Sequence, residues 1–323
     1  MKALAVFSGG LDSMLAVQLV RVQEIEILGL FFETPFFTSS GARKSAAHIK
    51  LPLEVIDITE SHLEVVKDPK HGYGENMNPC IDCHILMLRK AGEKLEEERA
   101  DFIITGEVLG QRPMSQNRKA LDVVASESGR PGLVLRPLSA KLLPKTIPEE
   151  KGWVDRDRLM GFSGRSRKPQ MELARELGIR EFPTPAGGCL LTDPGFSRRL
   201  KDLLTFSRDF DLRDIELLKV GRHFRIDPGT KVVIGRNERE NRIIRSLYRE
   251  GDLLLKPVSG PGPTVLVVGE TSPEQEEMAA SMTAAYCDPG DGEETVIGLR
   301  SRASQVSIRV KRREKREFQA YMI

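Results

Sequence analysis

Several features that mark other classes of protein are scarce in this chain. Of its 323 residues, four are cysteine, one is tryptophan and 6% are aromatic. Four cysteines are too few for a disulfide framework, and their scarcity is typical of a reducing compartment. No apolar run approaches the roughly 20 residues that cross a bilayer, and no signal-peptide pattern precedes the first expected strand. These absences predict a cytoplasmic protein with no membrane partner.

An excess of one charge is also missing, since 49 lysines and arginines face 47 aspartates and glutamates, for a net charge of +2. Binding to a polyanion must therefore come from local clusters of basic residues. The composition is 40% hydrophobic and 30% charged, which is ordinary for a globular protein. The length favours two domains.

The most informative segment is residues 6–13, which read Val-Phe-Ser-Gly-Gly-Leu-Asp-Ser. An apolar strand pattern leads into it, and residues 14–20 are apolar at helical spacing. The two glycines let a turn approach an anion without a Cβ clash, and Ser8 and Ser13 offer hydroxyl donors. Because a helix N-terminus presents unpaired N–H groups and partial positive charge, this strand–loop–helix unit predicts a phosphate site.

The Ser-Gly-Gly-Leu-Asp-Ser segment resembles the pyrophosphate-binding loop of the PP-loop (N-type) ATP pyrophosphatases, which include the tRNA thiouridine synthases. The resemblance implies that ATP is bound through its phosphates and cleaved to AMP and pyrophosphate. Asp12 is read either as an indirect Mg²⁺ contact or as a cap of the following helix, and it is included among the catalytic residues. The implied nucleotide contacts are Ser8, Gly9, Gly10, Leu11, Asp12 and Ser13, with Phe32 at the end of the second expected strand.

The first half of the chain alternates apolar runs with helical patterns. Strands are expected at 3–7, 25–32, 53–56, 102–105 and 133–135. Helices are expected at 13–22, 42–49, 61–66, 85–98 and 116–126. This alternation predicts an α/β fold with a doubly wound parallel sheet, in which ligands lie at the carboxyl ends of the strands. Segments 8–12, 33–40 and 106–116 fall there.

The second half has a different pattern. Residues 137–170 are expected to be irregular because four prolines interrupt them, and short helices are expected at 170–177 and 197–204. Beyond about residue 210, strands at 232–234, 253–255, 264–268 and 306–310 and a helix at 274–286 predict a separate α+β domain. We therefore expect a catalytic domain at 1–205 and an accessory domain at 206–323.

Three cysteines form the second constellation. Cys80 and Cys83 make a Cys-x-x-Cys motif at the start of an expected helix, and Cys189 follows in a proline- and glycine-rich loop. A helix N-terminus lowers the pKa of a thiol, so thiolate chemistry is expected at the pair. The pattern is similar to that of tRNA thiolation enzymes that hold a three-cysteine [4Fe-4S] cluster with one iron open to exogenous sulfide.

Two alternatives to the iron–sulfur cluster stay open. One is a persulfide relay, in which one of the three cysteines carries sulfur from an outside donor and a second resolves the intermediate. The other is a structural zinc with His84 or His71 as fourth ligand. In each case Cys80, Cys83 and Cys189 are the expected ligands or reactive groups.

Residues 105–116 read Thr-Gly-Glu-Val-Leu-Gly-Gln-Arg-Pro-Met-Ser-Gln and resemble a loop of the 4-thiouridine synthetases. The resemblance implies that Gly106 allows close approach of the adenosine and that Gln111 and Arg112 contact the α-phosphate or the target nucleotide. Among the basic residues on irregular backbone further on, Lys145 is expected to neutralise charge on the α-phosphate.

The stretch from residue 224 to 241 reads as strand, turn, strand, Gly-Arg-Asn and helix, and it resembles the RNA-binding domain of the NFACT proteins over about residues 220–315. The tail beyond residue 298 carries eight lysines and arginines, a cluster that predicts salt-dependent phosphate contacts. Together these resemblances imply an ATP-dependent tRNA uridine thiolase that needs a sulfide or persulfide donor, and a homodimer is compatible with them. The alternatives are a ligase or amidotransferase that adenylates a small molecule, and a non-catalytic RNA-binding protein.

Overall fold

The structure is a computed structural model that describes residues 1–183, 188–207, 209–288, 294–301 and 305–323. The chain divides into two compact units, Met1–Asp193 and Pro194–Ile323. Sequence patterns placed the division at residue 205, within the last turn of the helix that begins the second unit. None of the helices in the described segments is both long enough and apolar enough to cross a membrane.

The first unit is built on a five-stranded parallel sheet. Its order is β3-β2-β1-β4-β5, so the strand order reverses beside β1. The strands are β1 (Lys2–Val6), β2 (Glu26–Glu33), β3 (Leu53–Asp57), β4 (Phe102–Thr105) and β5 (Val134–Leu135). Each coincides with an expected strand to within one residue at either end, and the predicted parallel α/β class is confirmed.

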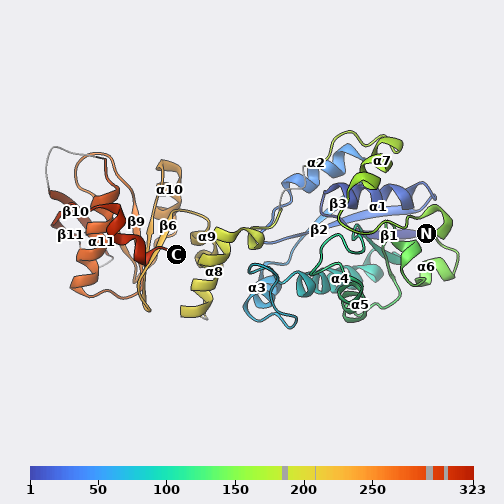
Figure 1. Ribbon diagram of the computed structural model, residues 1–323, viewed down its shortest axis with the longest axis horizontal. Coiled ribbons are helices and arrows are strands. Elements are labelled where there is room, and N and C mark those ends of the chain that lie inside the picture. The colour runs from blue at the N-terminus through green and yellow to red at the C-terminus, as the bar shows by residue number, and fades with distance from the viewer. Residues whose placement is uncertain (184–187, 208, 289–293, 302–304) are drawn as a thin grey trace. The chain divides into compact units, whose positions relative to one another are not determined.

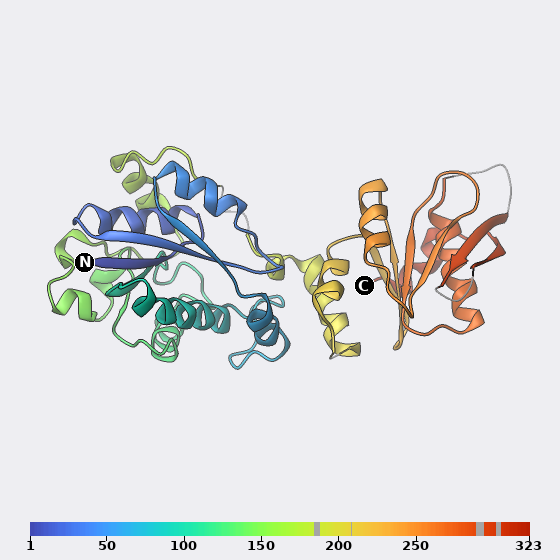
Figure 2. The same cartoon turned by 180° about the vertical axis from the view of Figure 1, so that it is seen from behind.

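Helices cover both faces of this sheet (Figures 1 and 2). One face carries α1 (Leu11–Arg21), α2 (Ser40–His48) and α7 (Lys168–Glu176). The other carries α3 (Thr59–Lys67), α4 (Cys80–Glu97) and α5 (Arg118–Glu127). Each layer buries its own apolar cluster against the sheet, with Leu15 and Leu173 in the first and Leu88 and Val124 in the second. Two buried cores on opposite faces define a doubly wound sheet.

Helix α4 begins at Cys80, earlier than the expected start at Ile85. Pro79 precedes it, and the Pro79 carbonyl accepts the N–H of Cys83 at 2.8 Å. Proline is favoured near a helix start because it has no N–H to satisfy. Both cysteines of the Cys-x-x-Cys motif therefore lie in the first turn of the helix.

The proline-rich segment between β5 and α7 contains only short helices, as its sequence predicts. They are η1 (Ala140–Leu142), α6 (Ile147–Glu150) and η2 (Arg156–Arg158). Thr146 and Glu149 form a capping box around α6, which satisfies backbone donors at its start.

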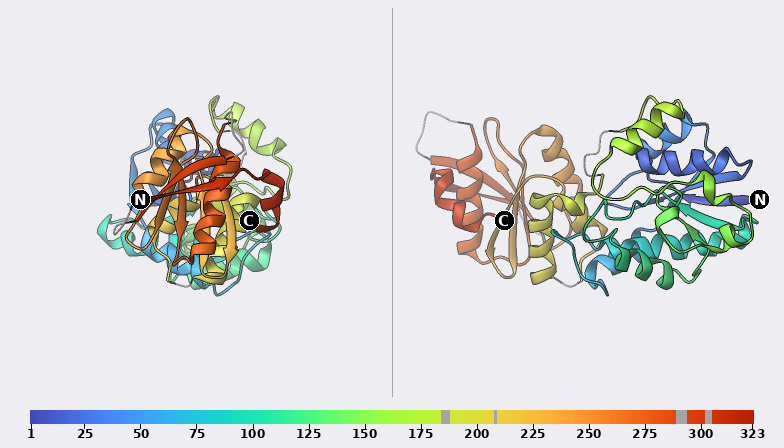
Figure 3. Two further views of the ribbon diagram at one scale, coloured as in Figure 1. Left: turned by 90° about the vertical axis from the view of Figure 1, so that its left-hand side faces the viewer. Right: turned by 45° about the vertical axis from the view of Figure 1, so that its right-hand side comes forward.

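The second unit contains a six-stranded antiparallel sheet of order β11-β10-β8-β9-β7-β6. The strands are β6 (Arg222–Asp227), β7 (Thr230–Ile234), β8 (Leu253–Pro257), β9 (Val265–Val268), β10 (Glu294–Arg300) and β11 (Gln305–Lys311). Helices α8 (Pro194–Phe206), α9 (Leu212–Leu218), α10 (Glu238–Ser246), α11 (Pro273–Tyr286) and η4 (Lys315–Tyr321) complete it. Helix α11 lies against this sheet (Figure 3). Its alanines form part of the core of the unit. The predicted α+β class is confirmed, although β10, α9 and η4 were not expected.

Candidate active site

The loop after β1 forms the turn that its glycines predict. Gly9 has φ +77°, and a Cβ there would lie 2.6 Å from the Cα of Ala42. Gly10 is the N-cap of α1 in extended conformation, without a side-chain cap. Ser13 Oγ donates to the Gly10 carbonyl at 2.8 Å, and Ser8 Oγ accepts the Gly10 N–H at 3.3 Å. The first N–H groups of a helix have no acceptor within it, so the loop and α1 form a cradle suited to an anion.

Asp12 lies in the first turn of α1, where it makes no N-cap bond. Its Oδ2 accepts a hydrogen bond from Gln111 Nε2 at 2.8 Å, and Gln111 Oε1 accepts one from Gln170 at 3.1 Å. Asp12 Oδ1 is buried and has no hydrogen-bond partner among the described residues. An unpaired carboxylate oxygen beside a phosphate cradle suits a hydrated divalent cation, so the geometry favours the Mg²⁺ reading of Asp12 over the capping one.

Gly106 is required by packing. A Cβ at this position would lie 2.5 Å from the backbone nitrogen of Ser13 and 2.7 Å from the carbonyl carbon of Asp12. The end of β4 therefore contacts the N-terminal turn of α1 directly. Close approach of α1 is thus one reason for glycine at this position, and close approach of the adenosine stays a prediction.

Two other expected nucleotide contacts differ in availability. Phe32 is 2% exposed and its side chain lies in the core beneath α4, so any contact from this residue would have to come from its backbone. Arg112 is exposed and lies close enough to Cys189 for its charge to act on that thiol.

The structure does not bring Lys145 to this site. Lys145 lines a small pocket with Gly132, the residue two places before β5, and the N–H of Ile147 donates to the Gly132 carbonyl at 2.9 Å. These contacts place Lys145 near the amino ends of the parallel strands, whereas the loop at residues 8–13 follows a carboxyl end. In Figure 1, α6 accordingly lies beside the start of β1. The expected role of Lys145 on the α-phosphate is therefore corrected.

The structure does bring the three cysteines together. Cys80 and Cys83 lie in the first turn of α4, and Cys189 caps the short helix η3 (Leu190–Thr192). The Cys189 segment is held by two bonds: Leu190 N–H donates to the Phe36 carbonyl, and Asn76 Nδ2 to the Thr192 carbonyl, each at 3.0 Å. The three thiols are close enough to influence one another's ionisation.

Ionisation of these thiols differs from the expectation based on the helix N-terminus. Burial raises the pKa of Cys83 well above its usual value, and the neighbouring Cys189 and Cys80 raise it further. Burial likewise raises the pKa of Cys189 to about 11. Without a bound partner both are thiols at neutral pH, so a metal or transferred sulfur would have to displace their protons.

Two residues that the sequence did not single out lie against these sulfurs. Asn78 Nδ2 is 3.2 Å from Cys80 Sγ, and His62 Nε2 is 3.3 Å from Cys83 Sγ. His62 is fully buried, and its ring contacts the rings of Phe36 and Phe37. Burial lowers the pKa of His62 to about 4, so the ring is neutral. In the sequence His62 occupies an ordinary position of a short helix, and nothing there links it to the cysteines.

The histidines expected as zinc ligands have other partners. His84 Nδ1 lies 2.9 Å from Glu107, and His71 Nε2 lies 3.2 Å from Glu127. Within the described residues, no three Cys, His, Asp or Glu side chains are arranged to hold a single metal ion. Zinc held by the three cysteines stays an alternative prediction, and it would need its sulfur ligands about 2.3 Å from the metal.

Glu107 forms a second buried group that the sequence did not reveal. Its Oε2 accepts from Arg136 Nε at 2.9 Å and from Thr105 Oγ1 at 3.1 Å. Burial alone would raise the pKa of Glu107, but the charge of Arg136 and the contact with His84 outweigh it and hold the pKa well below its usual range. The carboxylate thus joins β4 to the residue that follows Cys83.

Two family models match this chain, one in each unit. Residues 1–141 match the model described as thiamine biosynthesis protein (ThiI), and residues 221–322 match the NFACT protein RNA binding domain. Both resemblances expected from the sequence are confirmed. The first match contains the phosphate cradle, the Cys-x-x-Cys pair and the loop after β4.

The matches to curated relatives cover less than half of this chain. The chain is 32% identical over 124 residues to the tRNA-specific 2-thiouridylase MnmA of Karelsulcia muelleri (strain GWSS), a match that covers 35% of this chain and 32% of that protein. It is 29% identical over 146 residues to the probable tRNA sulfurtransferase of Geobacillus kaustophilus (strain HTA426), covering 42% and 34%. The chain thus spans about a third of the length of these relatives.

Among solved structures, a 4-thiouridine synthetase in complex with RNA and with bound ATP is 22% identical, with a TM-score of 0.36, and the match covers 55% of this chain and 51% of that one. The C-terminal part of the fibronectin/fibrinogen-binding protein of Streptococcus suis is 12% identical, with a TM-score of 0.28, covering 82% and 98%.

Proposed function

We propose that this protein is an ATP-dependent tRNA sulfurtransferase that replaces a uridine carbonyl oxygen with sulfur. The observation that supports it is the meeting of two groups at the carboxyl edge of one sheet: the phosphate cradle and the three cysteines. Asp12 bonds to Gln111, the next residue Arg112 lies near Cys189, and Glu107 contacts His84 beside Cys83. An adenylation site and a sulfur-bearing site joined in this way suit one reaction in two steps.

In the first step, the cradle would bind the phosphates of ATP through backbone N–H groups and the hydroxyls of Ser8 and Ser13. Asp12 Oδ1 would face a hydrated Mg²⁺ ion. The uridine carbonyl oxygen would attack the α-phosphorus, pyrophosphate would leave, and the oxygen would become part of an AMP leaving group. Arg112 takes the place expected for Lys145, because it lies on this edge and carries the charge that stabilises a crowded phosphate.

In the second step, sulfur would displace AMP from the activated base. Cys80, Cys83 and Cys189 suit a [4Fe-4S] cluster, since iron–sulfur clusters prefer thiolate ligands and are larger than a single ion. Such a cluster, with one iron lacking a protein ligand, would supply the sulfur atom received from an outside donor. Residues around the triad would hold the base, splayed from its stack, against the adenylated edge.

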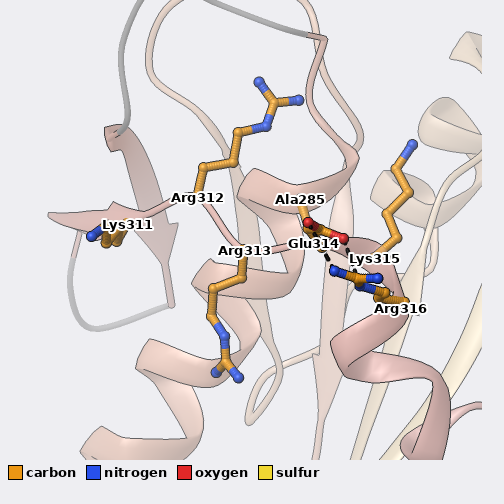
Figure 4. A pocket seen from close by; sticks show the side chains of 7 residues that line it. All are labelled: Ala285, Lys311, Arg312, Arg313, Glu314, Lys315 and Arg316. Carbon is orange, nitrogen blue, oxygen red and sulfur yellow. Dashed lines mark hydrogen bonds and ion pairs between the residues drawn. The ribbon is translucent and has the colours of Figure 1, made fainter.

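The second unit would hold the tRNA. Five basic side chains line a surface pocket of this unit together with Ala285 and Glu314 (Figure 4). They are Lys311, Arg312, Arg313, Lys315 and Arg316, and we call this group the basic ridge. Arg312 donates to the Cys287 carbonyl at 2.6 Å, while Arg313 and Arg316 form exposed ion pairs. Exposed ion pairs are weak, so phosphate can compete for these side chains.

The test is anaerobic purification with iron, sulfide and zinc analysis, followed by incubation with tRNA, ATP and sulfide. Nucleosides of the tRNA are then analysed for 4-thiouridine and 2-thiouridine. Cys80→Ala should abolish both the cluster and the product, and Asp12→Asn should abolish the product while the iron content is unchanged. Cys287→Ala is the matched control, because this cysteine is buried in the second unit and should leave both unchanged.

Each alternative has its own outcome. Thiolation without iron, supported by a persulfide donor and not by sulfide, would replace the cluster with a persulfide relay, and zinc in stoichiometric amount would make the cysteines structural. Pyrophosphate release with small carbonyl compounds and no RNA would identify a ligase. RNA binding without ATP cleavage would leave a non-catalytic RNA-binding protein and overturn the proposal.

A further inference from the structure

The two cysteines at the start of α4 each have one side-chain nitrogen within hydrogen-bond distance of sulfur. His62 comes from α3 and Asn78 from the loop before α4, and they contact different sulfurs. We propose that His62 and Asn78 are positioning residues that donate N–H hydrogen bonds to anionic sulfur at Cys83 and Cys80. The inference rests on the proposed function only in assigning anionic sulfur to the triad.

The direction of the His62 bond follows from the surroundings of its ring. His62 Nδ1 is buried and has no hydrogen-bond partner among the described residues, and Phe36 and Phe37 pack against the ring. A neutral ring carries one proton, on Nδ1 or on Nε2. A proton on Nδ1 would be a buried donor without an acceptor, which is rarer than an unused lone pair. The proton therefore belongs on Nε2, where it points at Cys83 Sγ.

The orientation of Asn78 is fixed in a similar way. Its Oδ1 accepts the backbone N–H of Asn76 at 3.1 Å, so the amide oxygen is already assigned and the NH₂ group faces Cys80. Gly74 leaves the room for this side chain, because a Cβ there would lie 2.5 Å from Asn78 Nδ2. A reversed amide would set two acceptors against each other at Cys80 and two donors at Asn76.

Two donors of this kind have a chemical consequence. A hydrogen bond to an ionised acceptor is about twice as strong as a neutral one, so both bonds gain strength once sulfur is bound to iron or carries a transferred sulfur atom. Donors to cluster sulfurs also tune the reduction potential of the cluster. The triad is therefore prepared for anionic sulfur in a buried place that otherwise disfavours it.

The first measurement is ¹⁵N NMR of the full chain labelled at histidine and purified without metal. Only five histidines are present, and His62→Gln identifies the signal. Protonation at Nε2 with bare Nδ1 is expected. Protonation at Nδ1 would make Cys83 the donor and overturn the assignment for His62.

The second measurement is the rate at which iodoacetamide alkylates each cysteine of the metal-free chain, followed by mass spectrometry. His62→Phe keeps the ring but removes the donor, and alkylation of Cys83 should slow about threefold, since lost thiolate is partly offset by greater nucleophilicity. His62→Gln keeps an amide donor and should restore most of the rate. Asn78→Asp keeps the oxygen that accepts from Asn76 and should slow Cys80 in the same way.

The matched control is His71→Gln, because His71 pairs with Glu127 and should leave both rates unchanged. Equal rates in His62→Phe and His62→Gln would show that the ring only fills space and would overturn the inference. Neither measurement uses ATP or tRNA, so a failure of thiolation activity is read separately from a failure of these bonds.

Discussion

Gly106 is a single position at which a missing side chain decides the local packing. Gly106→Ala would place a Cβ 2.5 Å from the Ser13 nitrogen, and the three nearest atoms are all backbone of Asp12 and Ser13, which leaves little room to relax. We expect the free energy of unfolding to fall by about 1–3 kcal/mol and ATP binding to weaken, because α1 would be displaced. Urea unfolding and ATP titration measure the two effects.

Gly41 offers a control with the same chemical change. It lies in helix α2, and a Cβ there would meet no atom within 4 Å. Gly41→Ala should raise the free energy of unfolding by about 0.5–1 kcal/mol, because alanine loses less backbone entropy in a helix. If both substitutions had the same effect, the packing role of Gly106 would be refuted.

Glu107 carries a buried charge that contributes to stability. Glu107→Gln leaves Arg136, which is 6% exposed, without a counter-charge, and breaking such a pair costs about 3–5 kcal/mol. The folded pKa of Glu107 lies below that of the unfolded chain. Its contribution is therefore complete above the unfolded value of about 4.3 and is lost as the pH falls below it.

Urea unfolding at neutral pH and at about pH 3.5 checks both parts of this prediction. The deficit of Glu107→Gln should be large at neutral pH and smaller in acid. Glu96→Gln is the control, because Glu96 is exposed and its nitrogen–oxygen distance to Arg130 is 3.7 Å; a change of about 0–1 kcal/mol is expected. A deficit that does not depend on pH would contradict the role of the Glu107 charge.

At single residues, the sequence predicts chemistry well where it is local and poorly where it depends on the fold. The glycines and serines of the cradle could be predicted because a strand, a turn and a helix follow one another directly. Lys145 was predicted at the wrong end of the sheet. The long irregular segment that contains it has no strand or helix pattern from which its position could be predicted. His62 and Glu107 were missed because their partners, Cys83 and Arg136, are distant in sequence.

Among the elements, the parallel strands could be predicted almost to the residue, because they are buried on both faces and read as continuous apolar runs. Strand β10 alternates between half-buried and buried residues around Gly298, and glycine weakens a strand pattern. Helix α9 spans only Leu212–Leu218, too short for a helical period to stand out. Both were missed for these reasons.

The carboxylate of Asp202 is one of the contacts that tie helix α8 to the second unit. Asp202 Oδ2 lies 2.7 Å from Arg225 and 3.2 Å from Lys231, which is 5% exposed. Asp202→Asn would leave a buried lysine charge without its partner and should destabilise the second unit by about 3–5 kcal/mol. Trp153 is the only tryptophan and lies in the first unit, so its fluorescence follows that unit, while circular dichroism follows both.

In urea unfolding, Asp202→Asn should lower the midpoint of the transition followed by circular dichroism. The midpoint followed by Trp153 fluorescence should not change. Asp209→Asn, an exposed neighbour, should move neither. A chain that ended the first domain at residue 205 would separate Asp202 from its partners, and the division after Asp193 avoids this. If the Trp153 transition fell as well, the two units would unfold as one.

For the whole molecule, two units with separate cores combine a reactive edge with a basic ridge, and the net charge of +2 hides this division. Binding of tRNA should therefore depend on where basic residues lie rather than on their number. Replacing Lys311, Arg313 and Arg316 by glutamine should reduce the slope of log affinity against log salt by about 2–3, since each phosphate contact contributes about 0.7–0.9.

The comparison is a second triple variant with the same loss of charge, at Lys201, Arg239 and Arg242, which are exposed elsewhere in this unit. Titration of tRNA over a range of salt concentrations should give it the slope of the unmodified protein. Equal slopes for the two triple variants would mean that total charge alone attracts the RNA, and the ridge would then have no particular role. A lower slope for the ridge variant alone would mean that its side chains replace counterions at defined phosphates.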